Sequence, residues 1–162
     1  MGLITDEARA WAEQSLPAYE VDVGRTDIQR FARAVGETDP VYFDVAAARS
    51  AGHPDLLAPA YFPYVIRNQA AHLVDRERLA PDGSARGDVP PLPTTRAMAG
   101  ETEIELGPPI HAGDTITLEK RIMDLYEKEG RSGTLVFVKT EFTFRNQHGE
   151  AVFTERFTRI YR

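Results

Sequence analysis

The chain has 162 residues, of which 42% are hydrophobic and 27% are charged, and its formal net charge is −6. These values suit one globular domain, so we expect a single domain over residues 1–162. The acidic balance argues against nucleic-acid partners and anionic membranes, and the lack of cysteine excludes disulfides and thiol catalysis. No apolar run is long enough to span a membrane and no secretory signal opens the sequence, so we expect a cytoplasmic protein.

The N-terminal region predicts a helix followed by a strand. Residues 4–16 carry apolar side chains at helical spacing, with Thr5 as the N-cap and Pro17 as the stop. We therefore assign residues 1–16 to an N-terminal helical segment. In residues 18–24 apolar and acidic side chains alternate, which is typical of a strand with one buried face.

A second helix is expected from Thr26, where Thr26 and Gln29 have the spacing of a capping box. Gly36 is suited to a left-handed C-terminal cap, and the residue before Pro40 is biased towards extended backbone. We therefore predict a short non-helical turn after the helix. Three polar side chains that could take part in chemistry stand on this turn: Glu37, Asp39 and Tyr42.

The middle of the chain predicts one long helix and one long loop. Asp44 should cap a short helix that ends at Gly52. Residues 61–79 have a helical, mostly apolar pattern, with Pro63 tolerable in the first turn, and we expect this helix to be buried. Residues 80–95 are rich in Pro, Gly and Asp, which predicts a long loop at the rim of a site.

The last third predicts an antiparallel sheet. Four segments with alternating or strand-forming residues are separated by turn sequences: 97–106, 115–126, 133–145 and 151–161. In the second segment the alternation breaks between Leu118 and Leu125. A strand, then helices, then an antiparallel meander indicates an α+β fold in which the sheet wraps one long helix.

The turn after the second predicted helix resembles the signature S-G-D-x-N-P-L-H-x-D of MaoC-type (R)-specific enoyl hydratases. Gly36, Pro40 and Asp44 match the glycine, the proline and the trailing acid. Three positions differ from the family pattern. Glu37 stands in place of the catalytic Asp, Asp39 in place of Asn, and Tyr42 in place of the catalytic His.

Other segments resemble the FAS1-like dehydratase branch of the same family. Residues 58–63 are similar to its A-P-P-T-F-P, residues 99–101 to its H-G-E, and residues 108–115 to its P-l-r-a-G-D-t turn; residues 126–128 and 159–162 match as well. The resemblance implies a hot-dog fold, in which a curled antiparallel sheet surrounds one central helix and two subunits join edge to edge. It implies no organic cofactor and no metal. The implied ligand is an acyl thioester of coenzyme A or of an acyl carrier protein.

The altered motif weakens the case for independent catalysis. Hydration of an enoyl thioester needs a base, an acid and donors to the enolate oxygen. A tyrosine with a pKa of about 10 is a donor and not a base at neutral pH, and Glu37 is one methylene longer than Asp. The resemblance therefore favours a scaffold and acyl-binding subunit that pairs with a His-bearing hot-dog chain, in a hetero- or homo-oligomer. Two alternatives stay open: a homodimeric enzyme using Glu37 and Tyr42, and a non-enzymatic acyl-thioester-binding protein.

The remaining candidates are a predicted substrate channel and the histidines. We expect Tyr61, Phe62 and Val65 of the long helix to line the acyl channel, together with the loop at 80–95. His53 precedes this helix and is a further candidate for substrate binding, whereas His111 and His148 fall in predicted turns and should be solvated. No histidine has the spacing of a metal site.

Overall fold

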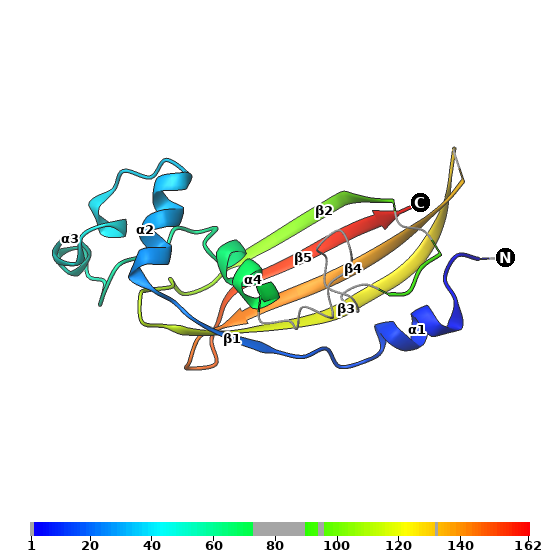
Figure 1. Cartoon of the computed structure of the whole chain (residues 1–162), viewed down its shortest axis with the longest axis horizontal. Helices are drawn as coiled ribbons and strands as arrows, with labels where there is room; N and C mark the ends of the chain where they lie inside the picture. The colour runs from blue at the N-terminus through cyan, green and yellow to red at the C-terminus, as the bar shows by residue number, and fades with distance from the viewer. Residues whose placement is uncertain (1, 73–89, 94–95, 132) are drawn as a thin grey trace.

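The computed structural model describes residues 2–72, 90–93, 96–131 and 133–162, and its main feature is one antiparallel sheet (Figure 1). The strands are arranged in the order β1-β3-β4-β5-β2. Their bounds are Tyr19–Asp22 for β1, Ala97–Leu106 for β2, Thr115–Gly130 for β3, Gly133–Arg145 for β4 and Ala151–Tyr161 for β5. The predicted strands 97–106, 133–145 and 151–161 are confirmed, and β3 extends the predicted 115–126 to Gly130.

The helices fall into three groups (Figure 1). Helix α1 (Asp6–Ala12) lies beside the sheet towards the end where both termini are found, and α4 (Pro63–His72) lies against the sheet. Beyond the other end of the sheet is a helical lobe, which consists of α2 (Arg25–Ala34), the 3-10 helix η1 (Pro40–Tyr42) and α3 (Val45–Ser50). Among the described helices, none combines the length and the apolar composition needed to cross a bilayer.

The predicted break in β3 is a register shift in the pairing with β4. The pairing steps from Ile122–Thr140 to Asp124–Lys139, which leaves Met123 as an extra residue. Such a bulge increases the local twist and helps the sheet to curl. A second shift between Ala99 and Thr102 interrupts the pairing of β2 with β5.

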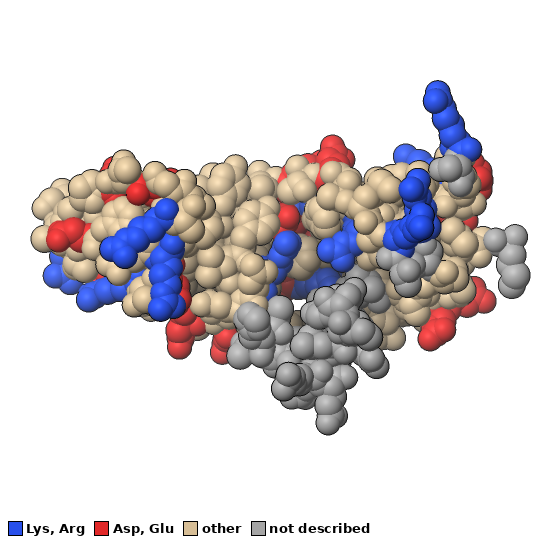
Figure 2. Space-filling view, turned by 45° about the horizontal axis from the view of Figure 1, so that its top comes forward, with Lys and Arg blue, Asp and Glu red and all other residues tan. Residues whose placement is uncertain are grey.

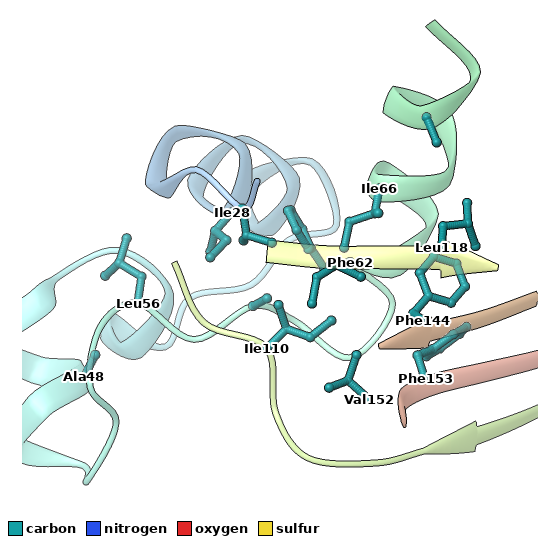
Figure 3. Packing of buried hydrophobic residues seen from close by; sticks show 14 residues of the cluster. Ile28, Ala48, Leu56, Phe62, Ile66, Ile110, Leu118, Phe144, Val152 and Phe153 are labelled. Atoms are coloured by element: carbon teal, nitrogen blue, oxygen red, sulfur yellow. The ribbon is translucent and has the colours of Figure 1, made fainter. Parts of the chain in front are cut away.

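The main core lies between α4 and one face of the sheet. Phe62, just before α4, and Ile66 of α4 are at most 1% exposed, and they converge with Leu118, Phe144 and Phe153 of the strands (Figure 3). A second apolar cluster around Val136, Val138 and Tyr161 lies under residues 3–4 and Leu92. A curled sheet around a central helix is the predicted α+β hot-dog arrangement.

An ion pair with a buried carboxylate joins α4 to β5 beside this core. The Glu155 carboxylate is 3% exposed and accepts hydrogen bonds from Arg67 Nη1 at 2.7 Å and Tyr64 Oη at 3.1 Å. The Arg67 guanidinium also lies over the rings of Tyr64 and Phe142, at 5.2 and 5.0 Å from their centroids. These contacts fix the rotation of α4 about its axis relative to the sheet.

Some local predictions were wrong. Helix α2 begins at Arg25 with Gly24 as its N-cap and no side-chain cap, so Thr26 and Gln29 do not form a capping box. Helix α1 has the predicted Thr5 cap, with Thr5 Oγ1 accepting from Ala8 N, but ends at Ala12. Residues 13–15 are exposed, so no packing extends the helix towards Pro17.

Two predictions fall partly on residues that the structure does not describe. The predicted helix at 61–79 is observed as α4 up to His72, and its continuation lies outside the described residues. The predicted loop at 80–95 also lies outside them, except for residues 90–93.

Candidate functional site

The candidate site begins where α2 ends. Gly36 has φ +82°, its N–H donates to Arg33 O, and Glu37 N donates to Ala32 O at 2.9 Å. These two hydrogen bonds form a Schellman cap, the left-handed ending that the sequence predicts. The cap turns the chain sharply and places Glu37 at the start of the segment that carries the altered motif.

The segment after the cap is non-helical over residues 37–39, as predicted, and then forms a single 3-10 turn, η1, which was not predicted. Asp39 is the N-cap of η1, its Oδ1 accepting from Val41 N at 3.0 Å, and Pro40 is the first helical residue. Asp44 then caps α3 as predicted, with Oδ1 accepting from Ala47 N at 2.7 Å. Two of the motif's acidic residues therefore hold helix ends.

Contacts from two directions hold η1 in place. Gln29 Nε2 of α2 donates to Phe43 O at 3.0 Å, and Leu57 N donates to Val41 O at 3.1 Å. The Tyr42 ring also contacts the Phe43 ring edge to face. Gln29 was predicted to cap its own helix, but its side chain instead fixes the turn that presents Tyr42.

Tyr42 lines a largely apolar cavity of about 280 Å³. The cavity lies between the 57–60 segment, the first residue of α4, and the end of β2 with the turn that follows it. Its lining residues are Tyr42, Leu57, Ala58, Pro59, Ala60, Pro63, Leu106, Gly107, Pro108, Pro109, Ile110 and Val152. Among these lining residues, Tyr42 is the one with a polar side chain.

The surroundings of Tyr42 keep its hydroxyl protonated. Burial raises the pKa of the Tyr42 phenol, and the negative charges of Glu37 and Asp39 raise it further. The three predicted motif residues are thus close enough to interact electrostatically. At neutral pH Tyr42 is a hydrogen-bond donor, and a proton-abstracting role for it is disfavoured.

Two histidines outside the lining join the chain segments that carry Ala58 and Ile110. His53 Nδ1 and His111 Nε2 are 3.0 Å apart, and His111 N donates to Asp114 Oδ2 at 2.7 Å. The His111 side chain is 14% exposed, so the expectation that it is solvated was wrong. Burial lowers the pKa of His111, an effect that Asp114 opposes and His53 reinforces. The described residues contain no group of three or more metal-ligating side chains.

The predicted channel residues lie outside this cavity lining. Phe62 is 1% exposed and packs edge to face on Phe31 in the core, whereas Tyr61 is 57% exposed. Val65 and His53 are half-buried. Sequence reasoning missed the 106–110 turn as a cavity wall, although its Pro-Pro pair, next to a strand end, marks a rigid segment.

Basic and acidic side chains are interspersed over the helical lobe on the face drawn in Figure 2. Helices α2 and α3 supply arginines at 25, 30, 33 and 49. Arg25 forms a bidentate pair with Asp55, at 2.6 and 2.8 Å, and lowers the pKa of that carboxyl to about 2. This pair links α2 to the 53–58 segment that leads to the cavity.

A family model described as "FAS1-like, dehydratase domain region" matches residues 12–155. The chain belongs to this family of dehydratase domains. The match confirms the resemblance to the MaoC-like, FAS1-like branch and covers the altered motif, α4 and nearly all of the sheet.

Curated relatives of this FAS1-like dehydratase domain include a "UPF0336 protein" of Streptomyces griseus, 39% identical over 107 residues, or 65% of this chain and 63% of the relative. A "Probable enoyl-CoA hydratase alpha subunit" of Thermomonospora curvata is 31% identical over 80% of this chain and 41% of that protein. The matched segment thus spans about three fifths of the first relative and less of the second.

A solved structure has the same fold as this FAS1-like dehydratase domain. It is the C-terminally truncated HadBC (3R-hydroxyacyl-ACP dehydratase) complex of Mycobacterium tuberculosis, with TM-score 0.64 and 23% identity, covering 90% of this chain and 92% of that chain. At this identity the likeness shows the fold alone.

Proposed function

We propose that this chain is the scaffold and acyl-binding subunit of a MaoC-type (R)-specific enoyl-thioester hydratase or 3-hydroxyacyl-thioester dehydratase. Its partner is a hot-dog chain that carries the catalytic His. The carrier of the acyl group is coenzyme A or an acyl carrier protein. The single-domain organisation over residues 1–162 is part of the same proposal.

The observation that carries the proposal is the environment of Tyr42. The residue at the position of the family's catalytic His is a phenol whose pKa is raised, at the edge of an apolar cavity. Such a group donates a hydrogen bond to a thioester or hydroxyl oxygen and does not take up a proton at neutral pH. An apolar cavity with one donor suits binding of an acyl group better than the proton transfers of hydration.

The free edge of β2 supports a partner chain. In the described part of the chain β2 pairs only with β5, and all its residues except Ile104 are exposed. Met98 is 43% and Leu106 64% exposed, and Leu106 also lines the cavity. A subunit joined along this edge would cover both side chains and bring its own residues to the cavity.

A self-sufficient homodimer is the second candidate. It is favoured by the proximity of Glu37 and Asp39 to Tyr42, since a carboxylate beside a phenol supplies an acceptor and a donor in one place. In that enzyme Glu37 would be the base.

Variants within the assembled complex separate these roles. Enoyl-CoA hydration would be measured for this chain with a His-bearing hot-dog partner, comparing wild type with Glu37→Gln and with Tyr42→Phe. The subunit role predicts that kcat changes by less than about tenfold in either variant. Tyr42→Phe removes a neutral hydrogen bond, which contributes roughly 0.5–1.5 kcal/mol, and Glu37→Gln removes no catalytic base. A loss of three or more orders of magnitude in Glu37→Gln would instead place the base in this chain.

A further inference from the structure

The cavity beside Tyr42 has a closed floor and an open rim. The floor consists of the buried lining residues, namely Ala58, Pro59, Pro63, Ile110 and Val152. The rim consists of the exposed ones, namely Ala60, Leu106, Gly107, Pro108 and Pro109. Tyr42 and Leu57 are half-buried and lie between the two levels. A ligand therefore enters past the rim and Tyr42, and its far end meets the floor.

The floor is backed by the main hydrophobic core. Ile110 and Val152 belong to the same buried cluster as Phe62 and Phe153, which are each 1% exposed (Figure 3). Because such cores are close-packed, these side chains cannot retreat to let a longer chain pass. The depth of the cavity is therefore set by the side chains of the floor.

The walls are also held at a fixed distance. Ala58 N donates to Ile110 O at 2.8 Å, and Ala112 N donates to Leu56 O at 3.0 Å. The 3.0 Å contact between the His53 and His111 side chains joins the same two segments a second time. Prolines at the floor and rim restrict the backbone further. The cavity should keep its size when it is occupied.

We propose that this cavity limits the acyl chain to about ten carbons, and that the floor residue Ala58 is a determinant of that limit. The inference rests on the proposed acyl-binding role. An apolar cavity of roughly 150 Å³ accommodates benzene, so one of about 280 Å³ holds on the order of ten carbon atoms. Each buried methylene should raise the affinity about fourfold until the cavity is full, after which further methylenes add nothing.

Two alanines, one in the floor and one outside the lining, provide a matched pair of variants. Ala58 is 8% exposed and part of the core, whereas Ala46 of α3 is exposed and does not line the cavity. Ala58→Val adds two methyl groups at the floor, and Ala46→Val adds the same groups outside the cavity. Val152→Ala removes two methyl groups from the floor and acts in the opposite direction.

The test is the affinity of the purified chain for saturated acyl-CoAs of 4 to 16 carbons, measured by calorimetry after thermal melting has shown that each variant is folded. Wild type should gain about fourfold per methylene up to about ten carbons and then level off. The break should move about two carbons down in Ala58→Val and two up in Val152→Ala, and stay in place in Ala46→Val. Either floor variant alone suffices if the other does not fold.

The outcomes separate the two proposals. If acyl-CoAs bind without a break, or if the break is the same in the floor variants as in wild type, the length limit is wrong and acyl binding stands. If no acyl-CoA of any length binds, the proposed acyl-binding role itself is overturned.

Discussion

The ion pair between Arg67 and Glu155 should be one of the largest single polar contributions to the stability of this fold. We predict that Glu155→Gln lowers the free energy of unfolding by about 2 kcal/mol. The carboxylate is 3% exposed and loses a charged hydrogen bond of 2.7 Å, and such bonds contribute roughly 1.5–3 kcal/mol. The Arg67 side chain is 33% exposed, so water screens its unpaired charge and the loss stays below the roughly 3–5 kcal/mol of a fully buried broken pair.

Thermal melting followed by circular dichroism measures this effect. For a chain of this size 1 kcal/mol corresponds to roughly 2–4 °C, so we expect Tm to fall by about 4–8 °C. Glu119→Gln is the matched control, because its 3.2 Å pair with Arg145 joins side chains that are 51% and 42% exposed and should contribute less than about 1 kcal/mol. If both variants melt at the same temperature, the argument from burial is refuted.

The other predictions concern the cavity and its surroundings. Tyr42→Phe should weaken the binding of a ten-carbon acyl-CoA by about two- to tenfold in calorimetry. Tyr61→Phe, which removes the hydroxyl of an exposed ring, should leave this affinity unchanged. Equal affinities of the two variants would show that the Tyr42 hydroxyl does not contact the ligand. Gly107→Ala should lower Tm by several degrees, because a Cβ there would lie 2.0 Å from Ala151 O; an unchanged Tm would mean that the turn can move. Lowering the pH should destabilise the protein, since burial lowers the pKa of His111 in the folded state and the unfolded chain therefore binds more protons. In urea unfolding, the free energy of unfolding should be at its full value above pH 6.5, the ordinary pKa of histidine, and should fall progressively below that pH. His111→Gln should make this fall with pH less steep. An equally steep fall in the variant would show that His111 is not its cause.

The strands could be predicted closely because their signals are local. Alternation with period two and glycine-containing turns fix both ends of β4 and the start of β5, and Gly149 has the left-handed φ of +81° that the hairpin requires. The Schellman cap at Gly36 and the Asp44 cap are likewise encoded within a few residues.

The errors arose where distant residues compete with local ones. The Gln29 side chain could cap its own helix, but it is long enough to reach across the turn, where its Nε2 donates to Phe43 O. His111 stands in a sequence typical of a solvated turn, yet pairing of residues 56–58 with 110–112 buries its ring against His53. The cavity depends on the same pairing, which explains why its wall at 106–110 could not be found from sequence periodicity.

Enoyl-CoA hydration by this chain alone, and by this chain mixed with a His-bearing hot-dog partner, is the most direct test of the central claim. The account predicts no turnover from the single chain and turnover from the mixture, with both chains eluting together. Robust hydration by the pure single chain, lost in Glu37→Gln, would contradict the subunit role and establish a self-sufficient site.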